Sequence, residues 1–143
     1  MISRCSIRSL GLLVLAITAA PAFAEEFSAR LGRVPVDSRN QASVSGIGRA
    51  SGELEGDQLQ ITGQFSGLGG AATVANLHMG PAVGVRGDVI HALELDAAIE
   101  GELSGTVRLT AEQLAALRAG RLYIQIHSEA APDGNLFGWL LEE

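Results

Sequence analysis

Apolar and polar side chains alternate along most of this chain, and the alternation is clearest near its end. Leu122, Ile124 and Ile126 occupy every second position of the segment 122–128, with Tyr123, Gln125 and His127 between or after them. A period of two places successive side chains on opposite faces of a strand. Seven other segments have a similar pattern, so we expect strands over residues 27–34, 42–51, 59–65, 73–79, 89–95, 103–109, 122–128 and 136–141.

Glycine-containing turn segments separate these strands at residues 55–57, 67–70, 84–87 and 132–135. Glycine, asparagine and aspartate accept the backbone angles that tight turns need. Short strands separated in this way are typical of an antiparallel, immunoglobulin-like β-sandwich or barrel. The predicted fold class is therefore all-β.

One segment, residues 110–120, lacks the alternation and has the features of a helix. Thr110 can cap its start, Gln113 stands at the capping-box position, and Gly120 follows its end. Leu114 and Leu117 form a narrow apolar stripe. We expect one short helix that packs across one end of the β domain.

The first 24 residues have the pattern of a secretory signal peptide. Arg4 and Arg8 precede an apolar run over residues 10–20, and small residues at Ala22 and Ala24 precede a cleavage site before Glu25. The apolar run is too short to cross a bilayer. We therefore expect a signal peptide over residues 1–24, a single β domain over residues 25–143, no stable membrane anchor, and a periplasmic or secreted protein.

Composition removes several classes of function. The only cysteine, Cys5, lies in the predicted signal peptide, so the expected mature chain has no thiol for a disulfide, a thiol enzyme or a zinc ribbon. Without Arg4 and Arg8, eight arginines face sixteen acidic residues. This acidic balance argues against nucleic acid as a partner.

Six pieces of the sequence, in this order, resemble the CHRD (chordin) domain family: LGRVPV at 31–36, FSGL at 65–68, ANLHMGPA at 75–82, the predicted helix at 109–117, AGRLYIQIHS at 119–128 and PDGNLFG at 132–138. The order and spacing of the pieces carry the resemblance, which covers nearly all of residues 27–143. It implies a bacterial exported single-domain member with an immunoglobulin-like antiparallel barrel, for which a topology like that of copper-zinc superoxide dismutase has been suggested. It implies no reaction, because most bacterial members have no assigned activity.

The chain departs from the family pattern in two places. The family usually has His-Ile-His where this chain has Asn76, Leu77 and His78, so the first histidine is replaced. The last strand of the family usually carries polar residues at alternate positions, whereas here Phe137 and Trp139 occupy them.

Histidines suggest one candidate site. Asn76 and His78 share one face of their predicted strand, and His127 lies on the outward face of a later strand that the resemblance places nearby. Imidazoles bind copper or zinc, but a well-held site usually has three or four ligands, and asparagine is a poor ligand for these metals. Structural histidines that only form hydrogen bonds remain the alternative, and the phase of His91 suits a core position.

Aromatic side chains suggest a second candidate site. If the last two strands pair, Tyr123, His127, Phe137 and Trp139 lie on one outward face, together with Leu141. Exposed aromatic residues grouped in this way often mark a contact with a partner or a second subunit. Alternatively, another strand or the N-terminal segment covers them.

We therefore expect a non-enzymatic binding or assembly module with no catalytic residues and no cofactor. Its binding surface would comprise Tyr123, His127, Phe137 and Trp139, and its partner would be an unknown protein or a second copy of the chain. The alternative is a copper- or zinc-binding protein, or a redox protein resembling superoxide dismutase, that uses His78 and His127 with Asn76. An acidic region between Asp88 and Glu102 lacks the ligand spacing of an EF-hand.

Overall fold

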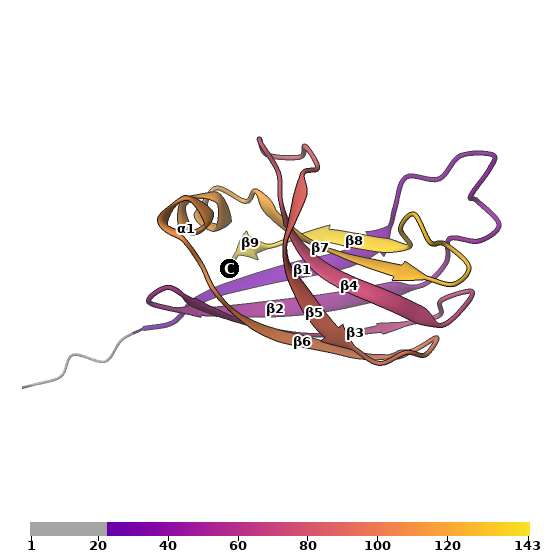
Figure 1. Cartoon of the computed structure of the whole chain (residues 1–143), viewed down its shortest axis with the longest axis horizontal. Helices are drawn as coiled ribbons and strands as arrows, with labels where there is room; N and C mark the ends of the chain where they lie inside the picture. The colour runs from indigo at the N-terminus through magenta and orange to yellow at the C-terminus, as the bar shows by residue number, and fades with distance from the viewer. Residues whose placement is uncertain (1–22) are drawn as a thin grey trace, which may run out of the picture.

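The computed structural model describes residues 23–143, which form an antiparallel β-barrel with one short helix (Figure 1). All but the last two residues of the predicted signal peptide lie outside the described residues. The strands are β1 (Glu25–Arg33), β2 (Ile47–Glu55), β3 (Gln58–Ser66), β4 (Ala72–Met79), β5 (Asp88–Leu95), β6 (Gly101–Arg108), β7 (Leu122–Ser128), β8 (Leu136–Trp139) and β9 (Leu141–Glu142). The all-β prediction is confirmed.

The sheet closes on itself. Its order is β2-β3-β6-β5-β4-β7-β8-β1-β9, and an additional pairing joins β2 to β1. Every pairing is antiparallel. Eight strands thus form the wall, and the short β9 extends the line of β8 along β1. Closure leaves few free strand edges.

The barrel interior is filled by the inward members of the alternating segments. Leu122, Ile124 and Ile126 are fully buried, and Leu59 and Leu77 join them in one hydrophobic cluster. Each fully buried aliphatic side chain contributes roughly 1.5–3 kcal/mol by leaving water. This interior is a packed core, so any binding site of the barrel lies on its outer face or in its loops.

Helix α1 (Ala111–Arg118) lies at the end of the barrel where the chain terminates, opposite the long loop between β1 and β2 (Figure 1). The Thr110 side chain accepts from the Gln113 amide, and the Gln113 side chain accepts from the Thr110 amide, so the predicted capping box is present. Leu117 is buried against the core. No helix within residues 23–143 is long and apolar enough to cross a membrane.

Three strand details differ from the prediction. Strand β2 begins at Ile47 rather than residue 42, because residues 38–43 form turns and Gly46 has a φ of 101°. The final segment breaks after Trp139, and Leu141 pairs with Ser28 of β1. In β5, Ile90 is an extra residue opposite the step from Leu77 to His78, which changes the phase of the strand.

Candidate functional site

Three rings stack across the outer face of the barrel, one each from β4, β7 and β8. His78 lies opposite Tyr123 in the strand register, and Tyr123 lies opposite Trp139. The ring centroids are 4.7 Å apart in both contacts; the first pair is nearly parallel at 13°, and the second is tilted by 52°. Both separations lie in the range of favourable aromatic pairs. We call these three side chains the ring ladder.

A short loop, residues 80–87, links β4 to β5 and is fixed onto the ring ladder. The Tyr123 hydroxyl donates to the Gly87 carbonyl oxygen at 3.0 Å and accepts from the Gly87 amide at 3.1 Å. At the other end, the Gly80 amide donates to the Arg121 carbonyl, and the Arg121 side chain donates to the Gly80 carbonyl. We call this segment the covering loop. Its Gly87 end is hydrogen-bonded to Tyr123 of β7, and its Gly80 end is hydrogen-bonded to Arg121, the residue that precedes β7.

The covering loop depends on glycine at both ends. A Cβ atom at Gly87 would collide with the Met79 carbonyl oxygen, and one at Gly80 would collide with the Val85 carbonyl oxygen. Neither collision can be relieved by turning a side chain, because both partners are backbone atoms. The close turn that brings Gly87 to Tyr123 therefore requires these two residues.

The covering loop corrects the expectation that Tyr123 is exposed. Only 1% of Tyr123 is accessible, and Trp139 and Phe137 are half-buried. The sequence left two alternatives for Tyr123: exposure to a partner, or cover by another strand or the N-terminal segment. Tyr123 is covered by its own chain, but by the loop between β4 and β5. Tyr123 thus supports the outer face from beneath.

His78 is held as a neutral imidazole. Its Nδ1 lies 3.1 Å from the Gly87 carbonyl oxygen, and because that oxygen only accepts, Nδ1 carries the proton. Its Nε2 is buried without a hydrogen-bond partner. Burial lowers the pKa of His78 below its ordinary value of 6.5, the positive field of His127 and Arg86 lowers it further, and the Gly87 hydrogen bond and Asp88 oppose the shift.

His127 is fixed to the turn between β7 and β8. Its Nδ1 lies 2.8 Å from the Pro132 carbonyl oxygen and therefore donates to it. Its Nε2 lies 3.4 Å from the side-chain nitrogen of Gln125, which also reaches the Asp133 carbonyl at 3.4 Å. His127 remains half-buried on the outward face, as the alternation predicted.

Phe137 lies beside the ring ladder in a small second cluster outside the barrel. It packs against Val34, Val44 and Ala131, which come from the β1–β2 loop and the β7–β8 turn. The Arg86 guanidinium lies 5.0 Å from the Phe137 ring centre, a cation–π distance. Leu141 is not part of this face, because the chain leaves β8 and joins β1 before it.

The structure does not bring the predicted metal ligands together. His78 is opposite Tyr123, whereas His127 is four residues further along β7, a rise of roughly 13 Å. Asn76 is opposite Gln125, between the two histidines. Within residues 23–143 no group of three or more His, Cys, Asp or Glu side chains is arranged to hold a metal ion. Copper or zinc binding therefore stays a prediction, and the described residues offer no third ligand of these types beside His78 and His127.

Two further residues near the candidate sites, His91 and Ser128, lie outside the ring ladder. His91 is half-buried and lines a shallow depression where β5 separates from β6, rather than filling the core. Ser128, next to His127, is fully buried; its hydroxyl donates to Asn135 Oδ1 at 2.8 Å and accepts from the Ala131 amide. Ser128 therefore holds the β7–β8 turn.

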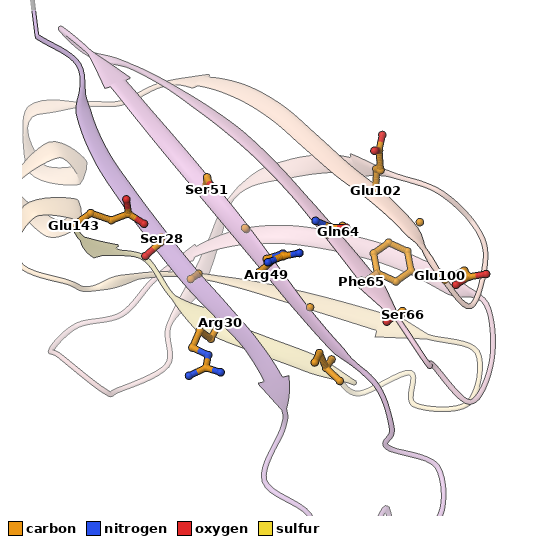
Figure 2. A pocket seen from close by; sticks show the side chains of 15 residues that line it. Ser28, Arg30, Arg49, Ser51, Gln64, Phe65, Ser66, Glu100, Glu102 and Glu143 are labelled. Atoms are coloured by element: carbon orange, nitrogen blue, oxygen red, sulfur yellow. The ribbon is translucent and has the colours of Figure 1, made fainter.

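A broad hollow of about 870 Å³ lies on another part of the outer wall, over β1, β2, β3 and β6 (Figure 2). Its polar lining includes Arg30, Arg49, Gln64, Glu100 and Glu102. Figure 2 shows the arginines on one side of Gln64 and the glutamates on the other. Its volume is in the range of small-ligand sites.

Several of these features could not be predicted from the sequence. Gly87 meets Tyr123 across 36 positions of the chain, and only the conspicuous glycines of residues 84–87 pointed to a turn there. Arg30 and Arg49 become neighbours through the β1–β2 register. The alternation of the sequence indicates which side chains of a strand point outward, but it does not indicate which residues of two strands lie opposite each other.

Comparison with known proteins gives one result. The family model described as the CHRD domain matches residues 27–140, which is most of the chain and includes the eight strands of the barrel wall apart from the first two residues of β1. Neither the curated proteins nor the solved structures contain a significant match. The chain belongs to the CHRD domain family.

Proposed function

We propose that this chain is a non-enzymatic binding module that acts outside the cytoplasm and recognises another protein. Membership of the CHRD family supports a binding role of an extracellular kind. The signal-peptide pattern of residues 1–24 supports export. The closed barrel supports a scaffold role, because its interior is packed and only its outer face and loops are open to a partner.

The observation that carries this proposal is a set of exposed valines beside the ring ladder and beside His127. Val89 lies opposite His78 and is 52% exposed, and Val74 lies opposite His127 and is 43% exposed. Val83 and Val85 of the covering loop are also exposed. The outer face of a barrel that is surrounded by water is usually polar. Four exposed valines on this side of the barrel therefore favour a contact with a protein.

The half-buried aromatic residues extend this surface. Trp139 and Phe137 keep part of their rings accessible, with His127 beside them. The Arg86 guanidinium rests over Phe137 and is itself exposed, so it can pair with a carboxylate. The partner that fits is a protein with apolar side chains flanked by an acidic residue.

The buried contacts beneath the covering loop suit a binding role. Tyr123 and His78 are buried under the covering loop and fix its Gly87 end. A surface held in one conformation loses less entropy on binding than a mobile one. The buried residues of the ring ladder, His78 and Tyr123, thus preorganise the accessible surface, which consists of Trp139, Phe137, His127 and the valines.

The test is to remove the exposed apolar groups without touching the core. The Val74→Ser, Val89→Ser double variant should retain its melting temperature and lose the protein recovered with the wild-type chain from the exported fraction. Ile99→Ser, at an exposed isoleucine of the β5–β6 connection, is the matched control and should retain it. Equal recovery with all three proteins would contradict the proposed surface.

A further inference from the structure

The register of the barrel places four polar side chains in one row across four strands. Arg30 lies opposite Arg49, Arg49 opposite Gln64, and Gln64 opposite Glu102. All four side chains line the hollow of about 870 Å³ (Figure 2). We call this row the charged row. Its two ends have opposite charge.

The cationic end is electrostatically unsatisfied. Arg30 and Arg49 are directly opposed, and like charges in that position destabilise a sheet. Neither belongs to any of the three ion pairs formed within residues 23–143. In Figure 2 the Arg49 side chain extends toward Gln64, over the hollow. A carboxylate bound there would offset the repulsion and accept charge-assisted hydrogen bonds.

The anionic end is separate and equally accessible. Glu102 and Glu100 are exposed, and Figure 2 shows both on the far side of Gln64 from Arg49. Arg49 and Glu102 stand on strands separated by β3, so their backbones are roughly 10 Å apart. Arg49 and Glu102 do not form one of the ion pairs found within residues 23–143, and Gln64 lies between them.

We propose that the charged row binds a small zwitterion, with its carboxylate at Arg49 and Arg30 and its ammonium group at Glu102 and Glu100. A simple polyanion fits poorly, because Glu100, Glu102 and Glu143 line the same hollow and repel it. At roughly 3.3–3.6 Å per extended residue, a peptide of about three residues with free ends spans the distance. The ligand class is therefore a short peptide with free termini.

This site is distinct from the proposed protein-binding surface, although the two adjoin. Gly32 pairs with Phe137 and Ser28 pairs with Leu141, so the same register places Trp139 opposite Arg30. Trp139 is the only tryptophan of the chain. Its fluorescence is consequently a local reporter for ligands that bind near Arg30.

The test uses trialanine and its two blocked forms, followed by amide chemical shifts of Arg49 and Gln64 and by tryptophan fluorescence. Trialanine should saturate the site, and N-acetylation or C-terminal amidation should each weaken binding about tenfold, which corresponds to one lost charge-assisted contact. An N-acetylated peptide that binds as tightly as trialanine would overturn the zwitterion assignment. Absence of saturable binding by trialanine would also overturn it.

Variants assign the two ends. Arg49→Gln should weaken trialanine about tenfold and leave the amidated peptide unchanged, because that peptide has no carboxylate; Glu102→Gln should weaken trialanine and leave the acetylated peptide unchanged. Arg33→Gln, on the same strand as Arg30 but outside the hollow, and Val89→Ser, on the proposed protein surface, are controls that should bind trialanine like the wild type. Equal binding by Arg49→Gln and the controls would refute the site even if the protein-binding proposal holds.

Discussion

Tyr123 and Gly87 are joined by two hydrogen bonds, one in each direction, so a single phenol hydroxyl fixes both polar groups of one loop residue. This contact connects β7 to the covering loop 36 positions away. It determines that Tyr123 is a buried support and that the accessible surface lies above it, on Trp139, Phe137, His127 and the surrounding valines.

Removing the Tyr123 hydroxyl should release the covering loop without disturbing the ring ladder. Tyr123→Phe keeps the ring that stacks on His78 and Trp139 and loses both bonds to Gly87. We expect the free energy of unfolding to fall by about 1–3 kcal/mol, since two hydrogen bonds are lost and each contributes roughly 0.5–1.5 kcal/mol. Urea unfolding measures this loss, and faster hydrogen exchange at Gly87 locates it; unchanged exchange there would show that the hydroxyl does not hold the loop.

A methyl group at Gly87 should displace the same loop by a different route. Gly87→Ala forces a Cβ atom against the Met79 carbonyl oxygen, and overpacking against backbone costs about 1–3 kcal/mol. The matched control is Gly32→Ala, because a Cβ atom at Gly32 meets nothing within 4 Å. Thermal unfolding should show a lower melting temperature for the first variant only. Equal melting temperatures would mean that the turn tolerates a side chain.

Acid should destabilise the protein through His78. Its pKa in the folded protein is below 6.5, chiefly because burial disfavours the imidazolium, so the unfolded chain binds the proton more readily. Stability is then fully present above pH 6.5 and declines as the pH falls from 6.5 through the lower pKa of the folded state. Protonation would also place a charged Nε2–H in a buried position that offers no acceptor.

Urea unfolding between pH 7.5 and pH 5 measures this effect. His127, Arg86 and Asp88 surround His78 electrostatically, so the same series in His78→Gln separates the contribution of His78 from theirs. The variant should lose less stability than the wild type over that interval. A loss of equal size in both proteins would assign the pH dependence to other groups.

Copper or zinc should not bind in stoichiometric amount. The ring nitrogen of His78 that is left to bind a metal, Nε2, is buried, and His127 lies four positions along β7 from the residue opposite His78, a rise of roughly 13 Å. We expect less than one metal ion per chain after dialysis and no difference between the wild type and the His78→Gln, His127→Gln double variant. Elemental analysis checks this; one bound metal that the double variant loses would establish the metal hypothesis instead.

Much of the fold was predictable because local pattern determines it. The alternation of Leu122, Ile124 and Ile126 predicted both the strand and its buried face, and Thr110 with Gln113 predicted the start of the helix. These features depend on residues within one element. The start of β2 was misplaced because the positive φ of Gly46 is not evident from its neighbours.

The candidate site was less predictable because it depends on register and on a tertiary contact. The outward phase of Phe137, Trp139 and His127 followed from the sequence, but the burial of Tyr123 requires a loop that returns over β7. The extra residue at Ile90 also places Val89 opposite His78 on the outer face, although Val89 is only two positions before His91, which lies opposite the buried Leu77. Pairings between distant strands, such as Arg30 with Arg49, have no local signature.

Site-specific photo-crosslinking in the native compartment tests the central claim most directly. A photoreactive residue placed at Val89, opposite His78, or at Val74, opposite His127, should give one discrete adduct with a single other protein. The same residue at Ile99, which is equally exposed but belongs to the β5–β6 connection, should give no such adduct. An adduct of twice the mass of the chain would assign the surface to a second copy, and equal labelling at all three positions would contradict a binding surface around the ring ladder.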